Sequence, residues 1–523
     1  MQWPFVKLLA LVVLLQCAGI ADHSLWTPDE PREAQIVREM SLAGDYLIPR
    51  LAGNAFLEKP PLYYLASAAS YALLGDRFPE AGRVASLVFA LGTLLVVWLT
   101  ARRLYSDRDA LPAPLILATF PLFFVSSHRI IVDMGLVFFI TTAMCSFLIA
   151  WRERSRTLYR VFWVSLACSF LCKGIIGLAI PGAGLLLFVL WHHDTGFLRD
   201  AWVPQGVLLV LAVIAAWAGV LYMRGGYGYL HTFFVYNQIG RFIPAGIVYG
   251  GGHVKPFYYY LYNIPLQTAP FSLLLIPAAA YARKAGASER FLFSWLLGGL
   301  LVLSLASTKR EIYFLPMLPA MALLIAWWES RPGDSRQPWE DRLMKAVSGL
   351  VAACSLALPA AYVAIGGSLA VAGLAVSALC VLFRIVWVRF RALHFMPVLL
   401  GWTMLLLVWT PVVIPQLDKG KSYRGMFEEL GRIVSHSEVI GYRLTETVEA
   451  LGPFYGQFAV KNIEDRLVFI DIMKRREAGY IIVLPGRMDE GLWRELGSCA
   501  VPAYRGGGGM RREIELWKMS SYP

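Results

Sequence analysis

Charge is scarce in this sequence. Of its 523 residues, 16% are Asp, Glu, Lys or Arg and 57% are hydrophobic, whereas soluble domains carry about 25% charged residues. This composition excludes an ordinary soluble enzyme. The 17 Trp, 24 Tyr and 29 Phe also exclude a disordered chain, because such chains lack the aromatic side chains that build a core.

Several motifs are missing as well. The seven cysteines contain no Cys-x-x-Cys pair, since even Cys168 and Cys172 stand four positions apart. They are predicted to be small buried residues, with neither a disulfide framework nor a thiolate zinc site. The four glycines at 506–509 lack the Gly-x-Gly-x-x-Gly context of a nucleotide-binding loop and predict a hairpin or loop.

Long apolar runs are what the sequence has in abundance. A bilayer core of about 30 Å is crossed by about 20 apolar residues in a helix. The stretch from 160 to 191 is too long for one crossing and is divided at Lys173 and Gly174. No clean small-x-small cleavage site follows residues 3–20, which predicts a retained span. The thirteen predicted spans are 3–20, 81–101, 110–127, 131–151, 160–172, 174–191, 201–223, 260–281, 291–306, 312–328, 346–366, 368–387 and 394–415.

Positive charge gives these spans an orientation. With the amino terminus in the cytoplasm, the loops on that side carry seventeen Lys and Arg residues, which agrees with the positive-inside rule. Two long segments, 21–80 and 224–259, then lie outside, and the odd number of spans places 416–523 outside too. The net charge of +12 therefore mainly reflects which loops lie in the cytoplasm. No nucleic-acid partner is predicted.

The last segment differs in composition from the rest. Residues 416–523 hold 16 Lys and Arg against 15 Asp and Glu, and strand-like runs alternate with helix-like ones. This alternation predicts a small α/β domain. The predicted fold is a polytopic α-helical membrane domain, 1–415, followed by an outward-facing α/β domain, 416–523. The predicted strands are 438–442, 467–470 and 480–484, and the predicted helices are 423–434 and 487–496.

The first outward segment is the most densely charged. Within 27–40, Ile36, Val37 and Met40 recur at helical spacing, with charged residues on the other face, which is typical of an interfacial helix. Charges near membrane depth are costly, so those that persist are candidates for function. Asp29 is such a candidate, although together with Glu30 it could simply cap this helix.

A second charged group follows in the same segment. Glu58 and Lys59 stand directly before Pro60 and Pro61, which stiffen the turn and begin an aromatic-rich helix. Acids and fixed cations at one membrane face predict a site for a phosphorylated lipid. The cations would neutralise the phosphate leaving group, and a carboxylate would orient or deprotonate the acceptor. The further candidates at this face are Asp133, Lys173, Arg241, His253, Lys255, Lys309, Arg310 and Tyr313.

Structural roles stay open for several of these residues. Asp133 could cap a span, and Lys173 could snorkel between two helices. Lys309 and Arg310 could anchor the next span, and His253 could be an ordinary loop residue.

Three motifs of the outward face together carry a family resemblance. They are Pro28-Asp-Glu-Pro-Arg-Glu-Ala, Gly44-Asp-Tyr-Leu-Ile-Pro and Glu58-Lys-Pro-Pro-Leu-Tyr-Tyr. The sequence resembles the ArnT-like branch of the GT-C glycosyltransferases, integral-membrane enzymes related to the dolichyl-phosphate-mannose-dependent protein mannosyltransferases. Weaker blocks follow in the expected order. They are His128-Arg-Ile-Ile-Val-Asp133, Leu171-Cys-Lys-Gly174, Gln238-Ile-Gly-Arg-Phe242, His253-Val-Lys-Pro-Phe-Tyr-Tyr259 and Lys309-Arg-Glu-Ile-Tyr-Phe-Leu-Pro-Met-Leu-Pro319.

This resemblance implies an activity and roles for individual residues. A sugar would move from a polyprenyl phosphate carrier to lipid A or another lipid or glycan acceptor, at the periplasmic face of the bacterial inner membrane. Asp29 would be the main catalytic carboxylate, Glu58 and Lys59 an acid–base pair beside the phosphate, and Asp133 a second acid. No cofactor is required, while a divalent metal held by Glu58 and His253 stays open. The residues expected to bind the donor are Arg32, Lys173, Arg241, His253, Lys309 and Tyr313.

Two departures from the family pattern leave the sugar and the acceptor open. Glu33 stands where the aminoarabinose transferases usually have Tyr, and Gln238 stands where they often have His. The alternatives are a protein O-glycosyltransferase of the same fold and a lipid-linked sugar transporter or flippase. A transporter would place charges near the bilayer midplane and show internal repeats. A polymerase or ligase of the O-antigen type would have its large outward loop late in the chain.

Overall fold

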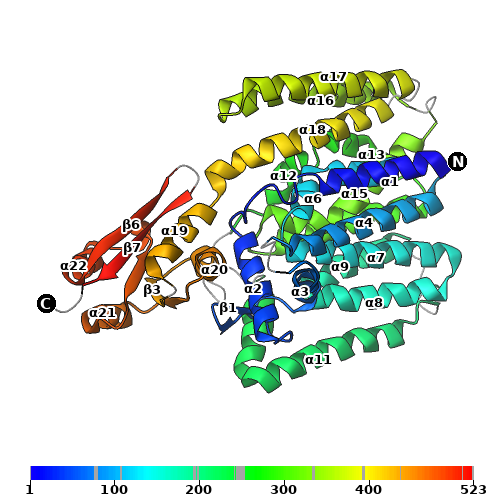
Figure 1. Ribbon diagram of the computed structural model, residues 1–523. Helices are drawn as coiled ribbons and strands as arrows, with labels where there is room; N and C mark the ends of the chain where they lie inside the picture. Colours follow the sequence, from blue (N-terminus) through cyan, green and yellow to red (C-terminus); the bar gives the residue numbers. More distant parts are fainter. Residues whose placement is uncertain are drawn as a thin grey trace. The chain divides into compact units, whose positions relative to one another are not determined.

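A computed structural model describes most of the chain (Figure 1). The chain forms two compact units. The described residues are 2–75, 80–106, 109–192, 196, 200–240, 242, 254–332, 336–390, 395–435, 437–508 and 511–520. The first unit comprises Met1–Ile20, Leu57–Ala66 and Arg83–Val413, and the second comprises Ala21–Phe56, Ser67–Gly82 and Ile414–Pro523. This division differs from the predicted boundary at 415/416, because 21–56 and 67–82 group with the tail.

The first unit is helical almost throughout. Each of the thirteen predicted spans falls largely on helix. Its elements are α1 (Gln2–Cys17), α4 (Arg83–Leu104), α5 (Pro112–Thr119), α6 (Pro121–Ser127), α7 (Val132–Glu153), α8 (Arg156–Lys173), α9 (Ile176–His192), α11 (Val203–Leu230), the π-helix η1 (His231–Ile239), α12 (Tyr259–Gln267), η2 (Phe271–Leu274), α13 (Leu275–Ala282), α14 (Ala287–Leu305), η3 (Glu311–Met317), α15 (Leu318–Ser330), α16 (Pro338–Ala364) and α17 (Leu369–Phe390). Two helices, α3 (Leu62–Leu74) and α18 (Met396–Lys421), run across a boundary between the units.

Within the described residues, eight helices are long and apolar enough to cross a membrane, or nine if one bent pair counts as a single span. The chain is thus a multi-pass membrane protein, and the count of thirteen stays a prediction. The difference comes from short or broken helices. The predicted span 110–127 is interrupted at Phe120, before Pro121, and α12 meets the helix Phe271–Ala282 at 116° just after Pro270. Proline has no backbone N–H to continue a helix.

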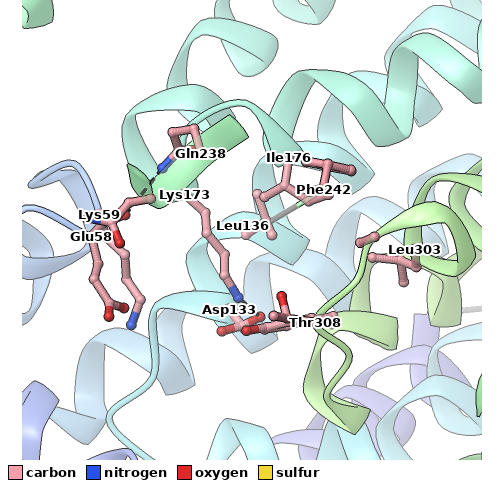
Figure 2. Close-up of a pocket in the computed structure, with 13 residues that line it drawn as sticks. Glu58, Lys59, Asp133, Leu136, Lys173, Ile176, Gln238, Phe242, Leu303 and Thr308 are labelled. Atoms are coloured by element: carbon pink, nitrogen blue, oxygen red, sulfur yellow. Dashed lines mark hydrogen bonds and ion pairs between the residues drawn. The ribbon is translucent and has the colours of Figure 1, made fainter. Parts of the chain in front are cut away.

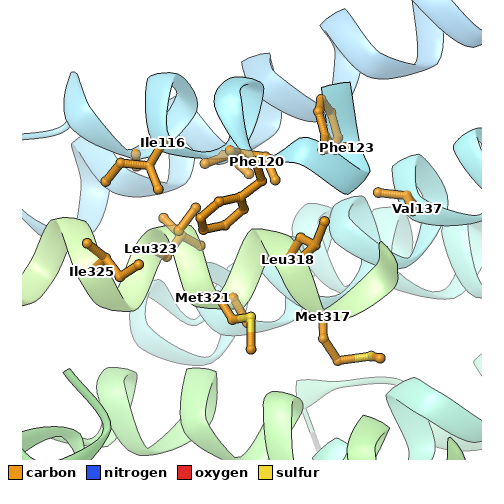
Figure 3. Packing of buried hydrophobic residues seen from close by; sticks show 14 of the residues in the cluster. Ile116, Phe120, Phe123, Val137, Met317, Leu318, Met321, Leu323 and Ile325 are labelled. Atoms are coloured by element: carbon orange, nitrogen blue, oxygen red, sulfur yellow. The ribbon is translucent and has the colours of Figure 1, made fainter. Parts of the chain in front are cut away.

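Side chains from α5, α6, α7 and α15 pack together in the hydrophobic core of the first unit (Figure 3). Phe120, Phe123 and Met321 are buried there with almost no exposed surface. Helix α14 also approaches α9 closely, because a Cβ on Gly298 would lie 2.4 Å from the backbone nitrogen of Gly184. Helices in lipid associate through such close packing of small residues, since lipid supplies no hydrophobic force between them.

The second unit contains a mixed sheet with the strand order β4-β3-β5-β7-β6. Strand β3 (Val439–Tyr442) pairs in parallel with β4 (Val460–Ile463) and β5 (Tyr480–Val483), and β7 (Arg511–Met519) runs antiparallel to β5 and β6 (Ala500–Gly508). The other elements of this unit are α2 (Glu30–Ala43), β1 (Arg50–Leu51), β2 (Asn54–Ala55), α19 (Arg424–Val434), α20 (Glu446–Leu451), the π-helix η5 (Gly452–Gly456), α21 (Arg466–Arg475), η6 (Pro485–Arg487) and α22 (Glu490–Cys499).

The tail confirms some local predictions and corrects one. The strands predicted at 438–442 and 480–484 and the helix at 423–434 are present, and most of the helix predicted at 487–496 is present as α22. The strand predicted at 467–470 is wrong, because these residues belong to α21. The Asp465 side chain caps that helix by accepting from the backbone N–H groups of Leu467 and Val468. The glycine-rich turn joins β6 and β7, with 509–510 outside the described residues.

All seven cysteines lie within the described residues and are free. Cys145, Cys172 and Cys499 are buried, whereas Cys17 and Cys380 are exposed rather than packed in the core.

Hydrogen bonds explain why an early segment joins the tail in one unit. The Asp418 carboxylate accepts from the Ser24 backbone N–H at 3.0 Å, the Ser24 hydroxyl at 2.7 Å and the Trp26 indole N–H at 2.6 Å. The Lys421 ammonium lies 4.5 Å from the centre of a Trp26 ring. Tyr455 accepts from the Leu25 N–H at 3.0 Å. The segment after α1 is therefore fixed by residues about 400 positions later in the chain.

Replacing Asp418 by alanine is expected to destabilise the second unit by about 2 kcal/mol, because three donors lose a charged acceptor. Thermal unfolding of the detergent-solubilised protein measures the loss. Asp471→Ala is the matched control, since it removes only an exposed ion pair with Arg475 on α21, a contact that contributes about 0.5 kcal/mol or less. Equal melting temperatures for the two variants would contradict this role of Asp418.

Candidate active site

A buried ion pair lies where α7 begins and α8 ends. The Lys173 ammonium donates to the Asp133 carboxylate. Asp133 is in the first turn of α7, and Lys173 is the last residue of α8. The two residues are 3% and 8% exposed, and the same ammonium lies 4.5 Å from the centre of the Tyr313 ring. Lys173 is thus held inside the protein by an acid and an aromatic face.

The Glu58–Lys59 turn reaches the same place from the amino-terminal side of α3 (Figure 2). Lys59 is 7% exposed, and Glu58 is half-buried. The backbone of the turn is held by side chains from η1. Gln238 donates to the Glu58 carbonyl oxygen at 3.3 Å, and Asn237 donates to the Leu57 carbonyl oxygen at 3.1 Å.

Both acid–lysine pairs line one pocket of the first unit. The space that it encloses, open solvent included, is about 630 Å³. Besides the two acids and two lysines, the wall has an apolar side that suits a lipid chain. The lining residues are Glu58, Lys59, Asp133, Leu136, Lys173, Ile176, Asn237, Gln238, Phe242, Leu303, Ala306, Thr308 and Tyr313. Five residues singled out from the sequence meet here: Glu58, Lys59, Asp133, Lys173 and Tyr313.

Lys309 is close to this pocket in sequence but does not line it. Its ammonium donates to the carbonyl oxygens of Ala306 and, at 3.2 Å, of Lys255. Burial lowers the pKa of Lys309, since a charged ammonium loses its hydration there. In this state Lys309 holds loop backbone, and its predicted contact with the donor stays a prediction.

Asp29 and Arg32 belong to the second unit, where a charged network surrounds them. Arg32 binds Asp29 at 3.3 Å, Glu33 at 2.9 Å and Glu446 at 2.5 Å, and its guanidinium lies 5.3 Å from the centre of the Phe56 ring. Asp29 precedes the first residue of α2, but its side chain makes no capping hydrogen bond. In this state the guanidinium of Arg32 is engaged by carboxylates. The predicted roles of both residues stay predictions.

Two predicted donor-binding residues, Arg241 and His253, lie outside the described residues. The metal pair of Glu58 and His253 is therefore not described either. Among the residues that the structure does describe, no group of three or more His, Cys, Asp or Glu side chains could hold a metal ion.

Sequence reasoning missed three polar residues of the pocket wall. Asn237 and Thr308 were not predicted as site residues, and Gln238 was noted only as a departure from the family pattern. A signal was present, because Asn237 and Gln238 are neighbouring amides that follow an aromatic run, Phe233 to Tyr236. They lie on a π-helix, a rare form that is frequent at functional sites.

The fold defines the class of protein. The structure superposes on ArnT from Cupriavidus metallidurans in the apo state with a TM-score of 0.79 and 19% identity, covering 98% of both chains. For the same ArnT bound to undecaprenyl phosphate, the TM-score is 0.77 at 19% identity, covering 98% of this chain and 97% of the other. The chain therefore has the GT-C fold.

Sequence similarity points to a particular branch of this class. Residues 58–219 match the family model described as dolichyl-phosphate-mannose-protein mannosyltransferase. The chain is 31% identical over 367 residues to the undecaprenyl phosphate-alpha-4-amino-4-deoxy-L-arabinose arabinosyl transferase of Pectobacterium carotovorum subsp. carotovorum (strain PC1). That match spans 69% of this chain and 64% of the relative. The resemblance to ArnT-like GT-C glycosyltransferases that the motifs carry is thus confirmed.

Proposed function

We propose that the protein is an inverting glycosyltransferase. It moves a sugar from a polyprenyl phosphate carrier to lipid A or another cell-envelope acceptor, at the periplasmic face of the bacterial inner membrane. The observation that carries this proposal is the pocket, in which two buried lysines and two carboxylates lie beside apolar residues. A phosphate attached to a long lipid needs cations and an apolar wall together.

In the proposed reaction, an acceptor oxygen attacks the anomeric carbon of the sugar from the face opposite the phosphate. The bond between this carbon and the phosphate oxygen breaks, and the polyprenyl phosphate leaves with an added negative charge. Lys59 and Lys173 stabilise that charge. Asp29 orients the acceptor and takes its proton, while Asp133 holds Lys173 in place. The carrier supplies the activation, so the reaction requires no nucleotide.

The proposed topology has thirteen crossings, with the amino terminus in the cytoplasm and 416–523 as a periplasmic α/β domain. The support is the excess of Lys and Arg in the loops assigned to the cytoplasm. In this arrangement Glu58 and Lys59 lie at the periplasmic face, where undecaprenyl-linked sugars would be used.

A protein acceptor is the second candidate. The family model that matches 58–219 is described by a protein mannosyltransferase activity, and attack by a Ser or Thr hydroxyl would use the same groups. Lipid A is favoured because the relative that matches a longer stretch of the chain is an aminoarabinose transferase by name.

Deleting the gene and comparing the envelope by mass spectrometry tests the proposal. We expect one lipid species to lose a fixed mass that equals the transferred sugar. The wild-type gene should restore this species, and a Lys59→Met gene should not, because its product lacks one phosphate-neutralising charge. Loss of the mass from the glycoprotein fraction alone would favour the protein acceptor, and unchanged lipids and glycoproteins would contradict transfer altogether.

A further inference from the structure

The Glu58–Lys59 turn has a backbone that regular structure does not satisfy. Residues 56–61 lie outside helices and strands, and Pro60 and Pro61 have no N–H to donate. Buried carbonyl groups need donors, and near a membrane each missing hydrogen bond is costly. The position of Lys59 therefore depends on whatever donates to this segment.

Two successive side chains of η1 supply these donors. Asn237 donates to the Leu57 carbonyl and Gln238 to the Glu58 carbonyl, and the two amides are 5% and 7% exposed. A π-helical turn holds more residues than an α-helical turn. Successive side chains are therefore rotated by a smaller angle, which lets neighbours on the chain reach neighbouring carbonyls.

Gln238 also contacts the backbone that follows Lys173. Its amide oxygen accepts from the Ile175 backbone N–H at 2.9 Å, two residues after Lys173. Gly174 has a φ of +71°, and a Cβ there would lie only 2.3 Å from the same amide oxygen. Gly174 thus permits both the backbone turn that ends α8 and the close approach of Gln238.

We propose that Gln238, assisted by Asn237, is a positioning residue that sets the two phosphate-facing lysines relative to each other. The amide nitrogen holds the Glu58 carbonyl, directly before Lys59, and the amide oxygen holds the Ile175 N–H, two residues after Lys173. The role rests on the proposed function, because it matters for the reaction only if both lysines serve one phosphate.

The two hydrogen bonds of Gln238 explain why an amide suits this position. The Gln side chain offers a donor nitrogen and an acceptor oxygen at the same depth. Leu offers neither, and an ionised Glu could accept from Ile175 but would face the Glu58 carbonyl without a proton. A shift of about 1 Å in a charge-stabilising group lowers a rate by about 100-fold.

The test compares Gln238→Leu with a matched control. Gln16 is fully buried and also bridges two elements, donating to the Ala118 carbonyl at 3.1 Å and accepting from the Ser127 hydroxyl at 2.6 Å. It does not line the pocket. We expect Gln16→Leu and Gln238→Leu to lower thermal stability similarly. Only Gln238→Leu should lower kcat/KM for sugar transfer, by about 100-fold per folded protein. Equal kcat/KM values for the two variants would overturn the proposal.

A second variant gives a signature that a merely structural role would not produce. At low pH the carboxyl introduced by Gln238→Glu is protonated and can again donate to the Glu58 carbonyl. The transfer rate of this variant relative to wild type should therefore rise as pH falls. A ratio of the two rates that does not change with pH would contradict the positioning role of Gln238.

Carrier binding separates this inference from the proposed function. Native mass spectrometry with undecaprenyl phosphate should show roughly tenfold weaker binding to Gln238→Leu than to Gln16→Leu, since misplaced lysines hold the phosphate less well. If wild type binds the carrier but transfers no sugar, the proposed function is wrong. The difference in carrier binding between the two variants then still tests whether Gln238 positions the lysines.

Discussion

Replacing Lys173 by methionine is expected to lower sugar transfer by roughly 100- to 1,000-fold, the usual cost of removing one group that stabilises transition-state charge. Lys173 is 8% exposed, and it is held by Asp133 and the Tyr313 ring at the pocket wall. Methionine keeps the length and apolar stem of lysine but carries no charge. Transfer of labelled sugar from a polyprenyl phosphate donor by the purified protein measures the loss. Lys345→Met is the control, because Lys345 is exposed on α16.

A double variant separates this catalytic loss from a loss of stability. Methionine at 173 leaves the Asp133 charge buried without its ammonium, a change that costs about 3–5 kcal/mol. Adding Asp133→Asn removes that charge, so the double variant should regain much of the lost thermal stability. It should not regain transfer, because no ammonium returns. Recovery of transfer together with stability would show that the pair is purely structural.

Replacing Asp29 by asparagine is expected to abolish transfer, with a fall of about 1,000-fold or more, because the amide cannot take a proton from the acceptor. Asn has nearly the shape of Asp, and its side-chain oxygen can still accept from Arg32. Folding and membrane insertion should therefore be unchanged. The same labelled-sugar assay, normalised to folded protein, measures the effect.

Asp45→Asn makes the same chemical change in the same unit. Asp45 pairs with Arg50 at 3.9 Å and accepts from the Leu47 backbone N–H at 3.2 Å. Asn keeps an oxygen that can accept there, so this substitution should leave transfer near the wild-type rate. Near-wild-type transfer by Asp29→Asn would show that the role assigned to Asp29 is wrong.

The sequence predicts the positions of the helices better than their continuity. Apolar runs locate helix in all thirteen predicted spans, because burial in lipid leaves the backbone few alternatives. The breaks at Pro121 and Pro270 could have been predicted from the prolines themselves. The apolar run 467–470 fits a strand and a helix equally well, and the cap at Asp465 was the signal that decides for a helix.

The sequence predicts those residues of the candidate site that carry a charge within an apolar stretch. Glu58, Lys59, Asp133 and Lys173 are charges in apolar surroundings, and they meet in one pocket. Gln238 could not be assigned to this pocket from the sequence, because its partners at 58 and 175 lie far away in the chain. The union of 21–56 with the tail rests on such distant pairs too, and no local pattern encodes them.

The network around Arg32 has a consequence for biosynthesis. Arg32 and Glu446 are separated by 414 positions, and Ser24 and Asp418 by 394. A ribosome adding about 5–20 residues per second takes roughly 20–80 s to cover the distance from Arg32 to Glu446. During that time the early helices can enter the membrane, but Asp29 does not yet have its final surroundings. With the role proposed for Asp29, the nascent chain is therefore expected to stay inactive until Glu446 has been made.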